Sequence, residues 1–263
     1  MKTSKTEPRL LCYDLGEGVT AFSTTRHGGV SEANYASFNI NPYCGDSADH
    51  VARNRQLLAD RLGLPASHIV LPHQVHGIEH RAVAPELLDM SDAVRDKILD
   101  GVDMVTTSMT SVCIGVSTAD CIPVLLYDPV ARATAAIHAG WRGTLQRICQ
   151  RAVMAMQLHY GTTPDRLRAV VGPGISLANF EVGQEVYDQF VQAGFDLTET
   201  AEWHTKWHLD LPGINIRELI GCGVAPEHIH HAGICTFDHA DDYFSARRLG
   251  IDSGRIYTGI LMR

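Results

Sequence analysis

The chain has 263 residues, of which 45% are hydrophobic and 20% charged, a balance typical of globular proteins with a substantial core. Its net charge of −8 argues against binding to nucleic acid or to an anionic membrane, so any anion site must be local. The first residues contain no apolar signal core, no apolar run is long enough to span a bilayer, and the seven cysteines include no C-x-x-C pair. We therefore expect a cytoplasmic protein.

Apolar patterns along the chain predict a mixture of strands and helices. Strand patterns occur at 10–22, 68–71, 102–106, 112–116, 122–127, 134–137, 167–171 and 255–261. Helical patterns occur at 46–62, 91–99, 182–193, 212–220 and from about Leu145 to a stop at Gly161. The sequence shows no repeat, low-complexity tract or linker, so we expect a single domain over 1–263.

The loop 23–31 after the first strands is a candidate anion site. It contains Arg26 followed by His27 and two glycines. Such a loop can hold an anion through the arginine, or it can be a surface turn with a solvated arginine, and both interpretations stay open.

Three histidine-rich segments are candidate sources of metal ligands. His73 and His76 lie three residues apart beside Gly77, and taken alone this pair is better explained by one solvated and one hydrogen-bonded core histidine. The segment 203–208 has histidines four apart, but it is short and uncapped, which favours a mobile aromatic surface segment. The segment 227–231 alternates like a strand and is expected to expose its histidines.

The central stretch 117–144 contains the strongest candidate site. Its two apolar runs flank Asp128-Pro129, which predicts a hairpin centred between Pro129 and Val130. This register places Cys121 directly opposite His138, at the distance between two ligands of one metal or between a thiol and its base.

A glycine-flanked turn follows His138 and leads into the next helix. Gly140 and Gly143 leave backbone N–H groups available to an anion, and Arg142 adds a planar fork suited to phosphate or carboxylate. We therefore expect an anion cradle beside the Cys121–His138 pair.

The pair itself is compatible with two classes of chemistry and with a structural role. Cys121 and His138 can be zinc ligands with a third residue, leaving an open position for catalysis. Alternatively, Cys121 is a nucleophile with His138 as its base, or a buried cysteine beside a core histidine. Asp120 points to the other strand face, where a supporting hydrogen bond or a contact at the strand mouth is expected.

Three ordered motifs carry a resemblance to a known family. The motifs Q-V-H-G at 74–77, T-A-D-C-I-P-V-L at 118–125 and H-A-G-W-R-G at 138–143 resemble those of the multicopper polyphenol oxidoreductase laccase (YfiH-like) family, now described as purine nucleoside phosphorylases. The resemblance runs nearly end to end. It implies a mixed α/β fold with layered mixed sheets flanked by helices, similar to toxin-type cysteine deamidases. It also implies a zinc ion held by His76, Cys121 and His138.

The resemblance implies phosphorolysis of adenosine, inosine, guanosine and methylthioadenosine, with adenosine deamination as a side activity. Its substrates are then purine nucleosides and inorganic phosphate. We expect Arg26, Arg142 and the amides of Gly140–Gly143 to hold phosphate, with Asp120 or His73 moving protons. Two alternatives remain: a copper-dependent phenol oxidase and a cysteine amidase acting on a cell-wall precursor. Cu²⁺ can bind a His/Cys site, but the single His-x-His pair, at 228–230, does not support a multicopper cluster.

Overall fold

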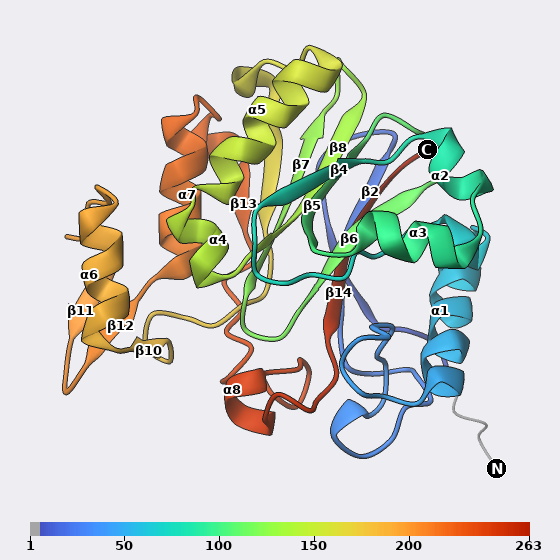
Figure 1. Cartoon of the computed structure of the whole chain (residues 1–263), viewed down its shortest axis with the longest axis horizontal. Helices are drawn as coiled ribbons and strands as arrows, with labels where there is room; N and C mark the ends of the chain where they lie inside the picture. The colour runs from blue at the N-terminus through green and yellow to red at the C-terminus, as the bar shows by residue number, and fades with distance from the viewer. Residues whose placement is uncertain (1–5) are drawn as a thin grey trace.

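Two β-sheets pack against each other in the computed structural model, which describes residues 6–263, and helices cover the outer face of each sheet (Figure 1). The sheets are mixed, and the layers follow the order helix, sheet, sheet, helix. This arrangement confirms the predicted mixed α/β fold. Within the described residues, no helix is both long enough and apolar enough to cross a membrane.

The six-stranded sheet contains the central hairpin. Its strands, in spatial order, are β13 (Ile229–His231), β9 (Arg168–Val171), β7 (Ile122–Asp128), β8 (Ala133–Ala139), β5 (Val102–Thr107) and β4 (Glu79–Ala82). The inner pairs are antiparallel, whereas β13 and β4 at the two edges pair in parallel with their neighbours.

The five-stranded sheet joins the two ends of the chain. Its strands, in spatial order, are β1 (Leu10–Tyr13), β2 (Val19–Thr24), β14 (Ile256–Met262), β6 (Cys113–Thr118) and β3 (Ile69–Val70). Side chains such as Ile114, Val116 and Leu125 are fully buried between the two sheets. Burying an aliphatic side chain of this size contributes about 1.5–3 kcal/mol, so this layer holds the sheets together.

Helices close the two outer faces. Helix α1 (Ala48–Leu62) packs Leu58 and Leu62 against the five-stranded sheet, and helices α4 (Trp141–Leu145), α5 (Ile148–Tyr160) and α7 (Leu211–Gly221) cover the six-stranded sheet. The remaining elements are peripheral: α2 (Pro85–Asp89), α3 (Asp92–Leu99), α6 (Gln184–Gln192), α8 (Ala246–Leu249) and a small sheet of β10 (Glu181–Val182), β12 (Trp207–Leu209) and β11 (Ala201–Trp203).

The predicted register of the central hairpin is wrong, because the observed centre of the hairpin lies one residue further along the chain. Pro123, not Cys121, is paired with His138, and the loop is centred between Val130 and Ala131. The reason is Asp128, which remains in β7 while its Oδ1 accepts hydrogen bonds from the N–H groups of Val130 and Ala131. The carboxylate thereby stabilises a four-residue loop, 129–132, in place of the tighter turn.

The segment 203–208 also differs from its prediction. It forms the facing ends of β11 and β12, in which Trp203 pairs with Trp207, rather than a mobile segment. Trp207 stacks on Tyr187 of α6 with ring centroids 3.7 Å apart, which explains the ordered hairpin. The histidines of 227–231 belong partly to β13, and His230 and His231 are exposed as predicted.

Candidate metal centre and active site

Three residues from separate segments form one possible metal site. His76 comes from the loop 71–78 between β3 and β4, Cys121 directly precedes β7, and His138 lies in β8. Their ligand atoms all lie within 4.8 Å of one another. His76 is exposed, Cys121 half-buried and His138 buried, so the site opens outward from the space between the two sheets.

The corrected hairpin register still brings Cys121 and His138 together. Pro123 is paired with His138, and Cys121 precedes Pro123 by two residues. Cys121 therefore lies diagonally across the hairpin from His138. A diagonal position on the same face remains within reach of side chains of this size.

A buried carboxylate, Asp103 of β5, orients both histidines. Its Oδ1 accepts a hydrogen bond from Nδ1 of His138 at 2.7 Å and one from the backbone N–H of His76 at 3.0 Å. Its Oδ2 accepts from the N–H groups of Gly77 at 2.7 Å and Val75 at 3.3 Å. Because Asp103 fixes the proton on Nδ1 of His138, the Nε2 atom is left to bind a metal.

The loop around His76 needs this carboxylate. His76 has a φ of 64°, in the left-handed region that a residue with a Cβ rarely adopts. Three successive N–H groups, at 75–77, converge on Asp103 and stabilise this conformation. The ligand position of His76 therefore depends on Asp103 as much as on its own side chain.

The electrostatics of the pair favour a thiolate. Burial raises the pKa of Cys121, but the charge of His138 and hydrogen bonds from both imidazoles outweigh this effect and lower that pKa to about 6. Burial lowers the pKa of His138, but Cys121 and Asp103 raise it to about 9. Burial also opposes ionisation of Asp103, yet its hydrogen bonds to His138, Gly77 and Val75 hold the pKa of this carboxyl below its usual value.

Gly140 is the close neighbour of the three ligands. A Cβ at this position would lie 3.1 Å from Sγ of Cys121 and 3.1 Å from Cδ2 of His76. Contacts this short require one of the ligands to shift, so the site accommodates only glycine there without displacement.

The donor set fits a zinc ion. Catalytic zinc sites use three protein ligands, drawn from histidine, cysteine and carboxylates, and keep the fourth position open. The low pKa of Cys121 supplies the thiolate, and the Asp103–His138 hydrogen bond is the supporting contact that metal-bound histidines usually make.

The three residues line part of a cavity of about 190 Å³. The other lining residues are Asn41, Tyr43, Cys44, His73, Gln74, Ser117, Thr118, Ala119, Ala246, Ile251 and Arg255. His73 therefore lies where the sequence suggested, beside the site but outside the ligand set. Its Nδ1 is 2.6 Å from Oδ1 of Asp100, and its ring lies 4.2 Å from that of Tyr43.

Asp120 supports the mouth of the site. Its Oδ1 accepts a hydrogen bond from Thr236 Oγ1 and its Oδ2 accepts one from the backbone N–H of Arg247, each at 2.7 Å. Both oxygens thus tie C-terminal segments to the start of β7, in agreement with the expected contact at the strand mouth.

The residues predicted to hold phosphate lie outside the cavity lining. Arg26 donates from Nε to Ala36 O and from Nη1 to Ala240 O, and Arg142 is exposed over the ring of Trp141. Gly140 and Gly143 are also outside the lining, although Gly140 lies against the side chains of Cys121 and His76. These positions leave Arg26 engaged within the protein and Arg142 directed to the surface.

The sequence interpretation missed Asp103 and the function of Gln74. Gln74 Nε2 donates to Ser117 O and its Oε1 accepts from Ser117 N, which attaches the loop 71–78 to β6. One signal for Asp103 was present: a carboxylate in the predicted buried strand 102–106 requires a partner that compensates for burial.

Comparison with known proteins finds relatives that match nearly the whole chain. A purine nucleoside phosphorylase of Bacteroides thetaiotaomicron is 44% identical over 97% of each chain. The adenosine deaminase RL5 of an unknown prokaryotic organism is 40% identical over 93% of this chain and 94% of its own. The crystal structure of the Bacillus licheniformis hypothetical protein YfiH matches with a TM-score of 0.90 at 28% identity over 97% of each chain. The family model of the multi-copper polyphenol oxidoreductase laccases matches residues 20–263, and the chain belongs to this family.

Proposed function

We propose that this protein is a zinc-dependent purine nucleoside phosphorylase, which acts on adenosine, inosine, guanosine and methylthioadenosine and deaminates adenosine as a second activity. The observation that carries the proposal is the His76–Cys121–His138 cluster, which lines a cavity and whose two histidines contact one buried carboxylate. Relatives named purine nucleoside phosphorylase and adenosine deaminase, at 44% and 40% identity, support the substrate class.

Phosphorolysis makes defined demands on the site. An oxygen of phosphate bonds to C1′ of the ribose while the C1′–N9 bond breaks, and the purine leaves with the bonding electron pair and takes up a proton. A zinc ion bound by the three ligands would supply Lewis acidity toward the departing base or toward water. The chain's own residues must hold the anion, exclude competing water and deliver the proton.

Of the two predicted proton carriers, His73 is better placed. Its ring lines the cavity and its Nδ1 is paired with Asp100, so Nε2 is left to exchange a proton with a substrate. Asp120 instead uses both carboxylate oxygens in contacts to Thr236 and Arg247. We therefore assign proton transfer to His73. Arg26, Arg142 and the Gly140–Gly143 amides stay predictions for phosphate binding.

One observation favours a second candidate function. His138 lies between Cys121 and Asp103, the arrangement of a cysteine hydrolase, in which the carboxylate orients a histidine base. A hydrolase of this kind needs Cys121 as a free thiolate nucleophile, whereas a bound zinc ion would coordinate the same thiolate. Removal of zinc should therefore abolish phosphorolysis, whereas it should preserve or raise a Cys121-dependent hydrolysis.

A single time course separates these activities. Zinc-quantified protein is incubated with inosine, with and without phosphate, and hypoxanthine, ribose 1-phosphate and free ribose are measured. A phosphorylase consumes inosine only with phosphate and gives ribose 1-phosphate. Free ribose at the same rate in both buffers would contradict the proposal. Oxygen uptake with a catechol in proportion to bound copper, with inosine unchanged, would instead identify a phenol oxidase.

A further inference from the structure

The cavity beside the possible metal site is lined without a single carboxylate, although the whole chain has a net charge of −8. Two acids that contact histidines of the cavity are themselves outside its lining: Asp103 contacts His138 and Asp100 contacts His73. Among the lining residues, Arg255 is the only arginine or lysine. A cavity with one guanidinium, three histidines and no acid suits an anionic ligand.

The guanidinium of Arg255, which lines the cavity, is held by its own loop. Its Nη1 donates to the carbonyl oxygens of Ser253 and Gly254, and its Nη2 donates to Ile251 O at 2.9 Å. Within residues 6–263, its Nε–H has no hydrogen-bond acceptor. The loop carbonyls thus hold the guanidinium in one orientation and leave a donor for a ligand, which lowers the entropy cost of binding.

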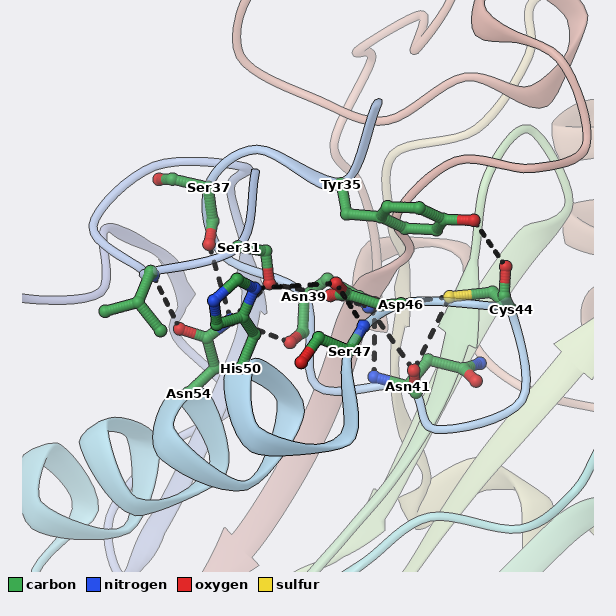
Figure 2. Close-up of polar contacts among 11 residues, drawn as sticks. Ser31, Tyr35, Ser37, Asn39, Asn41, Cys44, Asp46, Ser47, His50 and Asn54 are labelled. Carbon is green, nitrogen blue, oxygen red and sulfur yellow. Dashed lines mark hydrogen bonds and ion pairs between the residues drawn. The ribbon is translucent and has the colours of Figure 1, made fainter. Parts of the chain in front are cut away.

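A polar network of Asn39, Asn41 and Asp46 fixes the wall beside Arg255. Asn39 Oδ1 accepts a hydrogen bond from the backbone N–H of Asn41, while Asn39 Nδ2 donates to Asp46 (Figure 2). The same Oδ1 also accepts from the backbone N–H of Arg255. Asn41 in turn donates to Ser117 Oγ on β6. Asp46 accepts from Ser31, Asn39 and Ser47, so this carboxylate is engaged in the network and does not line the cavity. The wall therefore combines Arg255 with amide and hydroxyl groups in fixed positions.

We propose that Arg255 is the anion-binding residue of the cavity and that it holds the inorganic phosphate used in phosphorolysis. This inference rests on the proposed function for the identity of the anion. Arg26 and Arg142 are not among the residues that line the cavity, whereas Arg255 shares this cavity with His76, Cys121 and His138. A phosphate there lies in the same enclosed space as the metal ligands, as transfer to a nucleoside bound between them requires.

The test compares Arg255→Lys and Arg255→Gln with the wild-type protein. The lysine variant keeps the charge but loses the planar fork, and the glutamine variant loses both. With inosine as co-substrate, we expect the KM for phosphate to rise about 10-fold or more in each variant, while the KM for inosine changes by less than about 3-fold. Arg53→Gln on α1 is the charge-matched control, because Arg53 is exposed and outside the cavity.

A direct binding measurement keeps the inference independent of the reaction. Titration calorimetry of zinc-loaded protein with inorganic phosphate should show binding to the wild type and to Arg53→Gln, and a loss of about 10-fold or more in affinity for Arg255→Gln. If inosine is not phosphorolysed but this pattern appears, the proposed function fails while the anion site stands. Unchanged phosphate affinity in Arg255→Gln, or no binding to the wild type, overturns the inference. If Arg255→Gln does not fold, as judged by circular dichroism, the same criteria apply to Arg255→Lys.

Discussion

Replacing Asp103 by asparagine tests whether this one buried carboxylate fixes the orientation of two candidate metal ligands, His76 and His138. All four contacts of this side chain come from N–H donors: His138 Nδ1 and the backbone of residues 75–77. Asparagine has nearly the same shape, but one of its two terminal groups is an NH₂ donor. Whichever way the amide is turned, this NH₂ faces two N–H groups that previously donated to a carboxylate oxygen.

The magnitude follows from these contacts. Asp103 is fully buried, so two donors lose their acceptor without compensation by water, at about 1–3 kcal/mol each. We expect the metal-free variant to lose roughly 2–6 kcal/mol of stability. We expect zinc affinity to fall about 10- to 100-fold, or about 1.4–2.8 kcal/mol, because His138 and His76 both lose their orientation.

The assay is a zinc titration in competition with a chelator, with stability measured separately by denaturant unfolding. Asp100→Asn is the matched control, since Asp100 also contacts a histidine in the cavity, His73, which is not a ligand. It should leave zinc affinity near the wild-type value. Zinc affinity of Asp103→Asn within about twofold of wild type would refute the reasoning, whatever happens to stability.

Two further predictions concern the ligands themselves. Purified protein should carry about one zinc per chain by elemental analysis, and Cys121→Ser and His138→Ala should each lose it while circular dichroism stays native, because an open catalytic site does not organise the core. Full zinc occupancy in Cys121→Ser would contradict the ligand assignment. In metal-free protein the lowered pKa of Cys121 means that its thiolate forms as the pH rises through about 6, so alkylation of the Cys121 peptide should be near its plateau at neutral pH. His138→Ala removes the charge that lowers this pKa and should move the midpoint of alkylation upward; an unchanged midpoint by mass spectrometry would count against the pairing.

The sequence predicted the three ligands but not the geometry that joins them. The family resemblance implied His76, Cys121 and His138 as ligands, whereas residue type and spacing alone left the functions of Cys121 and His138 open and did not favour His76. The hairpin register was set by a local effect, the Asp128 side chain bonding to Val130 and Ala131, which apolar periodicity does not report. The wrong register still predicted that Cys121 and His138 lie close together, because a side chain contacts its diagonal neighbour as well as its direct neighbour across a hairpin.

The choice of arginine could not be made from the sequence. Arg26 and Arg142 stand beside glycines, the usual local signal of an anion site, yet neither lines the cavity. Arg255 also follows a glycine, Gly254, but no strand-to-helix turn or second glycine marks it, and it reaches the cavity because β14, which it precedes, pairs with β6, which ends at the site. Contacts between segments more than a hundred residues apart depend on sheet topology, and local patterns contain no information on it.

The motif Q-V-H-G, by contrast, acquires a physical explanation residue by residue. Gln74 pairs with both backbone groups of Ser117 and so attaches the loop to the five-stranded sheet. His76 supplies one side chain of the candidate metal site, and the N–H of Gly77 donates to Asp103 in the six-stranded sheet. Val75 contributes its backbone N–H to Asp103 while the residue is 54% exposed.

The loop is therefore anchored to both sheets within four residues, and the distance of His76 from Cys121 and His138 depends on how the two sheets pack. That packing comes from the apolar layer between the sheets, so the geometry of the candidate metal site depends on the core. Substitutions in that layer should therefore change the site by moving His76.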